Sequence, residues 1–147
     1  MRRSRARCAR DAGSATLFIV GIAVAFLVFT GLVVDGGLAL ASRRDAANVA
    51  EEAARAGVQT IDEAELRENG EIVLAPNATG VALAKVPGAI GNATVTARSA
   101  VCAGTQCTVT ITIRRNTTLL QLAGIGSTSA TVTGRARIAR GVDQEEG

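Results

Sequence analysis

The feature that most constrains this chain is an unbroken apolar run at residues 15–34, ATLFIVGIAVAFLVFTGLVV. The run contains no charged residue and stops at Asp35. One helix needs about twenty apolar residues to cross roughly 30 Å of hydrocarbon. The apolar run therefore predicts a transmembrane helix over residues 15–37, with the lipid bilayer as its partner.

Charge is distributed unevenly around the apolar run. Residues 36–147 carry equal numbers of basic and acidic side chains, so this part has no basic excess that would favour binding to nucleic acid. Residues 1–14 form a basic arm with one Asp and five arginines: Arg2, Arg3, Arg5, Arg7 and Arg10. This excess predicts a cytoplasmic N-terminus and an extracytoplasmic C-terminal part in the cell membrane.

A cleaved secretory signal is the alternative interpretation of the N-terminus. Ala39, Leu40 and Ala41 form an A-x-A sequence, and cleavage after Ala41 would release everything beyond it. The hydrophobic region of a signal peptide is usually about 7–15 residues long. The greater length of the apolar run favours a retained anchor.

Helix-forming residues continue past the apolar run through residues 38–60 and predict a stalk helix that extends the anchor. Four small residues recur there at spacings of three and four: Ala46, Ala50, Ala53 and Gly57. They would give the stalk a narrow, flat face. This face could pack on the chain's own domain or on copies of similar subunits, and the sequence favours neither.

Two positions at the ends of this helix system have further interpretations. Gly21 and Ala25 form a small-xxx-small pair, which lets membrane helices approach closely and makes the N-terminal helix a candidate surface for a homo-oligomer. Asp35 could mark the outer boundary of the membrane or pair with a neighbour inside it. Its place at the edge of the apolar run favours the boundary.

Residues 61–140 predict a small α+β domain. From residue 93 onward, apolar residues alternate with Thr and Arg in three segments, the pattern of half-buried strands. We expect a three-stranded antiparallel sheet packed on short helices. The residues expected on its apolar face are Val95, Ala97 and Val101, then Val109, Ile111 and Ile113, then Ala130, Val132, Ala136 and Ile138.

The remaining segments are assigned around this sheet. Helices at 43–58 and 76–86, together with Leu119, Leu120 and Leu122, are the expected covers of the apolar face. Residues 59–75 are expected to form a polar connector, and the acidic tail at 141–147 is expected to be disordered.

Three cysteines divide between the two sides of the membrane. Cys8 lies in the basic arm, where a cytoplasmic thiol stays reduced. Cys102 and Cys107 lie in the outer part and predict a disulfide that closes a hairpin tip. Redox catalysis is disfavoured because the spacing is not C-x-x-C, and a zinc site would lack further ligands.

Residues with catalytic chemistry are scarce. The chain has no histidine, which excludes a histidine general base, a Ser-His-Asp triad and histidine metal ligands. Carboxylates gather in an alternately charged segment that is typical of a solvated surface: Asp62, Glu63, Glu65, Glu68 and Glu71. We therefore expect no enzymatic activity, no cofactor and no metal.

Four segments, in this order, resemble the N-terminal part of the TadE/TadG-like proteins of tight-adherence (Flp-type) pilus assembly. They are residues 11–16 (DAGSAT), 31–37 (GLVVDGG), 41–44 (ASRR) and 46–57 (AANVAEEAARAG). The resemblance covers roughly residues 10–60, and the alanine-rich composition resembles that of actinobacterial proteins.

The resemblance implies a single-pass, pilin-like membrane protein whose partners are other pilus or secretion subunits. Prepilin-type members carry Glu at the fifth position after a cleavage glycine, whereas this chain has Phe18 at that distance from Gly13. This difference favours an uncleaved, TadG-like protein with a structural, helix-packing role. The alternative is a signal-cleaved, exported binding domain that acts at the cell envelope.

Overall fold

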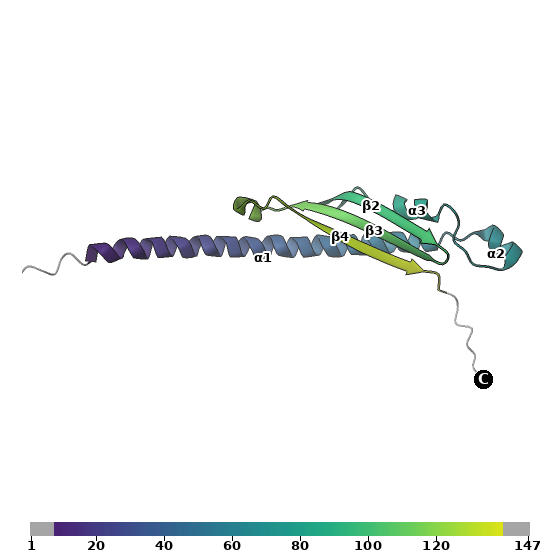
Figure 1. Ribbon diagram of the computed structural model, residues 1–147, viewed down its shortest axis with the longest axis horizontal. Coiled ribbons are helices and arrows are strands. Elements are labelled where there is room, and N and C mark those ends of the chain that lie inside the picture. The colour runs from purple at the N-terminus through teal and green to yellow at the C-terminus, as the bar shows by residue number, and fades with distance from the viewer. Residues whose placement is uncertain (1–7, 140–147) are drawn as a thin grey trace, which may run out of the picture. The chain divides into compact units, whose positions relative to one another are not determined.

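A computed structural model describes residues 8–139 of the chain (Figure 1). These residues form two compact units, one with residues 8–38 and 117–126 and the other with residues 39–116 and 127–139. Two parts of the sequence interpretation lie outside the described residues. They are the arginines at 2, 3, 5 and 7, and the tail at 141–147.

The expected membrane helix and stalk helix are one element, α1 (Cys8–Val58), of 51 residues. Apolar residues and helix formers follow one another along it without a proline. Gly36 and Gly37 lie inside the helix and do not interrupt it. The expected boundary between span and stalk is therefore not a break in secondary structure.

The sheet has four strands among the described residues, not three. They are β1 (Ala89–Ile90), β2 (Ala93–Ala103), β3 (Gln106–Asn116) and β4 (Ser127–Arg137). All neighbours pair antiparallel in the order β1-β2-β3-β4. The strand that the sequence missed is β1, because two residues are too few to show an alternating pattern.

A bulge in β2 corrects the expected faces of that strand. The register with β3 shifts between Val95 and Ala97, so one extra residue is inserted and the following side chains exchange faces. Val95 is partly buried, as expected, but Ala97 is exposed and Val101 is 68% exposed. Ala100 and Cys102 take the covered face in their place.

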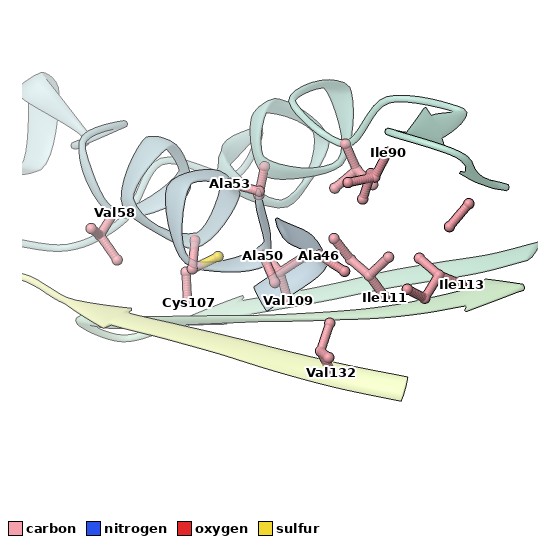
Figure 2. Close-up of a cluster of buried hydrophobic side chains, with 14 residues drawn as sticks. Ala46, Ala50, Ala53, Val58, Ile90, Cys107, Val109, Ile111, Ile113 and Val132 are labelled. Atoms are coloured by element: carbon pink, nitrogen blue, oxygen red, sulfur yellow. The ribbon is translucent and has the colours of Figure 1, made fainter. Parts of the chain in front are cut away.

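The apolar face of the sheet is covered by the C-terminal part of α1 and by α3 (Ala78–Ala84). Ala46, Ala50 and Ala53 are fully buried beside Val109 and Ile111 of β3 (Figure 2). These alanines, on the stalk's small-residue face, thus pack on the chain's own domain. Leu119, Leu120 and Leu122, also expected as covers, belong to the other unit and are absent from this buried cluster.

Small residues let α1 lie directly on the strands. A methyl group at Gly134 of β4 would overlap the backbone of Ala50 and Glu51. A core built from Ala, Val and Ile offers little area per side chain, so close contact between backbones replaces side-chain bulk.

The expected connector at 59–75 contains a short helix, α2 (Glu63–Asn69). Asp62 caps its first turn by accepting hydrogen bonds from the amides of Ala64 and Glu65. Gly70 ends it in the left-handed conformation, with φ of 68°. A 3-10 turn, η1 (Leu120–Ala123), lies between β3 and β4 in the sequence. It belongs to the unit that contains residues 8–38.

Candidate functional site

The N-terminal part of α1 exposes its apolar side chains around its circumference. Leu17, Phe26 and Leu27 are 77%, 68% and 73% exposed. Within the described residues, one helix is long and apolar enough to cross a membrane, by length and composition. A helix that is apolar on all sides and unburied by its own chain is a candidate membrane anchor.

The small-xxx-small pair lies on this exposed surface. Gly21 and Ala25 are both exposed, and a Cβ at Gly21 would meet no atom within 4 Å. The backbone at this point is therefore open to a close approach by another helix. Its role in packing stays a prediction.

Asp35, at the end of the apolar run, is a buried carboxylate that holds the turn before η1. It is only 5% exposed. One of its oxygens accepts hydrogen bonds from the amides of Leu119, at 2.9 Å, and Leu120, at 2.7 Å. The amide of Thr118 donates to both oxygens, at 3.1 and 3.2 Å. A carboxylate that accepts several backbone N–H bonds at the start of a turn acts as its cap.

Gly31, one helical turn before Asp35, allows this contact. A Cβ on Gly31 would lie 3.0 Å from the Cβ of Leu119. Absence of a side chain at position 31 thus lets the turn come close to α1. Together, Gly31 and Asp35 join residues 117–126 to the helix, and we call this contact the Asp35 clamp.

The Cys102–Cys107 disulfide is present and does more than close the hairpin tip. The two residues are paired opposite each other in β2 and β3, and Cys107 is fully buried. A Cβ on Gly57 of α1 would lie 2.6 Å from the Cys107 sulfur and 3.1 Å from the Cys102 sulfur. Gly57 is therefore the point where the helix packs directly on the disulfide.

The uncovered face of the sheet, which we call the outer face, is lined by hydroxyl groups and arginines. Thr110 and Thr133 share a hydrogen bond at 3.3 Å, and Thr112 and Thr131 share one at 3.0 Å. Arg114 donates to the hydroxyl of Ser127. Strands β2, β3 and β4 contain no Asp or Glu. The outer face is thus polar and positively charged.

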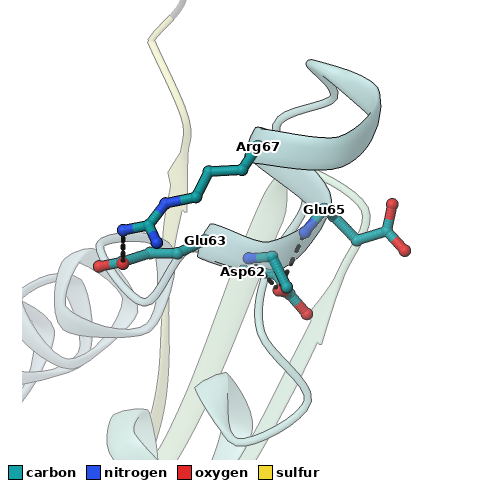
Figure 3. Close-up of polar contacts among 5 residues, drawn as sticks. Asp62, Glu63, Glu65 and Arg67 are labelled. Carbon is teal, nitrogen blue, oxygen red and sulfur yellow. Dashed lines mark hydrogen bonds and ion pairs between the residues drawn. The ribbon is translucent and has the colours of Figure 1, made fainter.

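The carboxylates at 62–71 are not gathered into a group of three or more that could hold a metal ion, among the residues that the structure describes. Asp62 serves as the helix cap, and Glu63 pairs with Arg67 at 3.0 Å (Figure 3). The side chain of Glu65 accepts a hydrogen bond from Asn69. Helix α2 buries none of its residues, so these groups belong to a solvated surface.

The sequence interpretation did not foresee the partner of Asp35. The pattern alone gave a charge at the edge of an apolar run, and the amides that bind it come from residues 83 to 85 positions later. A partial signal was present: Gly31 and Asp35 are one turn apart and both belong to the GLVVDGG segment.

Comparison with known proteins places the N-terminal part of the chain. No curated protein and no solved structure matches the chain. One family model does match, over the apolar run and the helix that continues it. Residues 13–60 match the putative Flp pilus-assembly TadE/G-like family, which confirms the resemblance seen in the sequence.

Proposed function

We propose that this protein is a single-pass membrane component of an Flp-type pilus assembly system, with a structural role. The observation that carries the proposal is the exposed apolar helix within the TadE/G-like segment. In this proposal residues 1–14 form a cytoplasmic arm and residues 15–37 span the membrane. Residues 38–60 form the stalk, and residues 61–140 form an extracytoplasmic domain.

The Asp35 clamp supports an anchor that is retained rather than cleaved. Cleavage after Ala41 would remove Asp35 and leave the amides of Thr118, Leu119 and Leu120 without their acceptor. These amides would then bond to water, and the turn would lose charge-assisted hydrogen bonds that contribute about 1.5–3 kcal/mol net each. The contact therefore favours the uncleaved chain over a signal peptide.

The distribution of buried residues supports an assembly role for the apolar run rather than for the stalk face. Ala46, Ala50 and Ala53 are already buried in their own domain. Gly21 and Ala25 face outward on a helix that the described chain does not bury. Other pilus or secretion subunits, or a second copy, would pack on this helix inside the membrane.

The state of the N-terminus and the topology test the anchor. We expect the mature protein to stay in the membrane fraction with its N-terminus intact. A membrane-impermeant maleimide should label a Glu68→Cys variant in intact cells, because position 68 lies on the exposed surface of α2. Cys8 should react only after permeabilisation, and a Cys8→Ser variant controls for its signal.

Each alternative has its own outcome. A mature start at Ser42 would support the exported domain, and a start at Ser14 would support prepilin processing. Labelling of Cys8 in intact cells would reverse the proposed orientation.

The assembly role is tested by complementation. Deletion of the gene should remove surface pili, and the wild-type chain should restore them. A chain with residues 15–30 replaced by polyleucine keeps Gly31 and the Asp35 clamp and should still enter the membrane. It should not restore pili, because it lacks Gly21 and Ala25. Full restoration of pili by this variant would mean that the apolar run serves only to anchor the protein.

A second candidate function is binding to envelope material through the outer face. The threonine pairs and the arginines, with no carboxylate on the long strands, favour a hydroxyl-rich or anionic partner. An exported binding domain would use this face. The N-terminal start at Ser42 would distinguish it from the anchored component.

A further inference from the structure

Residues 117–126, TTLLQLAGIG, form an uncharged segment that we call the apolar loop. Two of its apolar side chains, those of Leu122 and Ile125, are more exposed than buried. Leu122 is 89% exposed, Ile125 is 51% exposed and Leu119 is 38% exposed. The described residues of the chain offer these side chains no core to enter.

The apolar loop is continuous with the surface of the candidate membrane helix. It belongs to the same compact unit as the N-terminal part of α1. The Asp35 clamp fixes it at the end of the apolar run, where Leu32 is also 55% exposed. The exposed apolar surface therefore extends from the helix onto the loop.

Most backbone amides of the apolar loop donate hydrogen bonds within the protein. The amides of Thr118, Leu119 and Leu120 bind Asp35. Other backbone bonds close the loop on itself: Thr117 N–H to Gly126 O, Leu122 N–H to Leu119 O, Gly124 N–H to Gln121 O and Ile125 N–H to Leu120 O. Backbone groups must be bonded within the protein before a segment can enter a low-dielectric phase.

We propose that the apolar loop is a second membrane contact, which places Leu122 and Ile125 in the boundary between headgroups and acyl chains. This inference rests on the proposed anchor, because the bilayer it contacts is the one that α1 crosses. The loop carries no charge, so the partner is the hydrocarbon boundary and not a charged headgroup. Asp35, bonded to the three amides, would then lie at the level of the interface.

The absence of Trp and Tyr from the chain makes a direct test available. Single-tryptophan variants of the full chain are reconstituted in phosphatidylcholine vesicles whose acyl chains carry bromine, in one set at a shallow position and in another near the bilayer centre. Bromine quenches nearby tryptophans, so the shallow set reports on the loop and the deep set on the anchor. Leu122→Trp is the reporter, and Ile125→Trp is a second one in case the first perturbs the loop. Phe26→Trp, within the apolar run, reports on the anchor.

Val101→Trp is the matched control, because Val101 is also an exposed apolar residue and is 68% exposed. It pairs with Thr108 on β3, about 26 Å along that strand from Asn116 at roughly 3.3 Å per residue. Any general preference of tryptophan for interfaces would affect this variant equally.

We expect Leu122→Trp and Ile125→Trp to show blue-shifted, quenched emission, as Phe26→Trp does, and Val101→Trp to remain unquenched. Quenching of Phe26→Trp alone would overturn the loop contact and leave the anchor intact. No quenching at any position would overturn the anchor itself. Replacement of phosphatidylcholine by phosphatidylglycerol should leave the result unchanged, and loop quenching that needs the anionic lipid would overturn the assignment to hydrocarbon.

Discussion

Substitution of Asp35 by Ala removes the acceptor for three consecutive backbone amides. The two shortest bonds, from Leu119 at 2.9 Å and Leu120 at 2.7 Å, end on the same carboxylate oxygen. The third amide, that of Thr118, contacts both oxygens at longer distances. In the variant, water or nothing would take the place of the carboxylate, and the turn before η1 would open more often.

The size of this effect follows from the number of bonds lost. A hydrogen bond to a charged group contributes about 1.5–3 kcal/mol net. The two short bonds at the low end of that range give about 3 kcal/mol for closing the turn, and the longer Thr118 contacts are left out. Since about 1.4 kcal/mol corresponds to a tenfold change in an equilibrium constant, the open state should become about a hundredfold more populated.

Hydrogen exchange of the full chain in detergent micelles or nanodiscs measures this opening directly. We expect the amides of residues 118–120 to exchange about a hundredfold faster in Asp35→Ala, following the opening equilibrium. The amides of Val109 and Ile111 in β3 should be unaffected, because they belong to the other unit.

Asp35→Asn is the matched control, because it keeps a neutral oxygen acceptor of similar shape. Neutral hydrogen bonds contribute about 1 kcal/mol each, so this variant should lie between wild type and Asp35→Ala. Unchanged exchange at residues 118–120 in Asp35→Ala would show that the carboxylate does not hold the turn, and the reasoning would fail.

Two further predictions concern the domain core, both read from the exchange of β3 amides in the full chain. Gly57→Ala should destabilise the domain by about 1–3 kcal/mol, because its methyl group would press on the disulfide sulfurs. Gly80→Ala, in α3 where a Cβ meets nothing within 4 Å, should instead stabilise it by about 0.4–1 kcal/mol; the same sign for both variants would contradict the proposed packing. Replacement of Cys102 and Cys107 together by Ala should cost about 2 kcal/mol, the value for constraining so short a loop in the unfolded chain. Unaltered stability in that variant would mean that the unfolded chain already holds the two ends of the hairpin tip together, so that the bond constrains nothing further.

The elements with strong periodic patterns were predictable from the sequence. Val109, Ile111 and Ile113 alternate without interruption and occupy the covered face of β3. The helix formers that follow the apolar run continue it as a helix, as their composition predicts. The disulfide was predictable because two cysteines lie on either side of a short turn.

The sequence-based predictions of β1 and β2 were wrong because the structure of these strands depends on their pairing with other residues, which a local pattern does not show. The bulge between Val95 and Ala97 leaves the composition of β2 unchanged but reverses the faces of the residues after it, so Val101 was placed on the wrong side. The two residues of β1 form a strand because of their pairing with Ala93 and Thr94. Such features depend on partners that the alternation of residue types does not encode.

The partner of Asp35 was also not predictable from a local pattern, because it is distant in the sequence. Its amide donors lie more than eighty residues away in the chain. An Asp after a long apolar sequence is also the expected mark of a membrane boundary, so an adequate explanation of the residue was available without the clamp. Its burial, at 5% exposure, and its bonds to three amides add a structural role that a position at the boundary does not by itself require.

The contact between α1 and the sheet should tolerate smaller side chains better than larger ones, which is the opposite of what most protein cores tolerate. Ala46, Ala50 and Ala53 have one methyl group each to lose, whereas Gly134 and Gly57 have no space to gain one. Truncation, normally the more damaging change in a core, would leave only very small cavities here. Enlargement would push two backbones apart and separate the helix from its sheet. The positions where α1 meets the sheet are therefore restricted to the smallest residues.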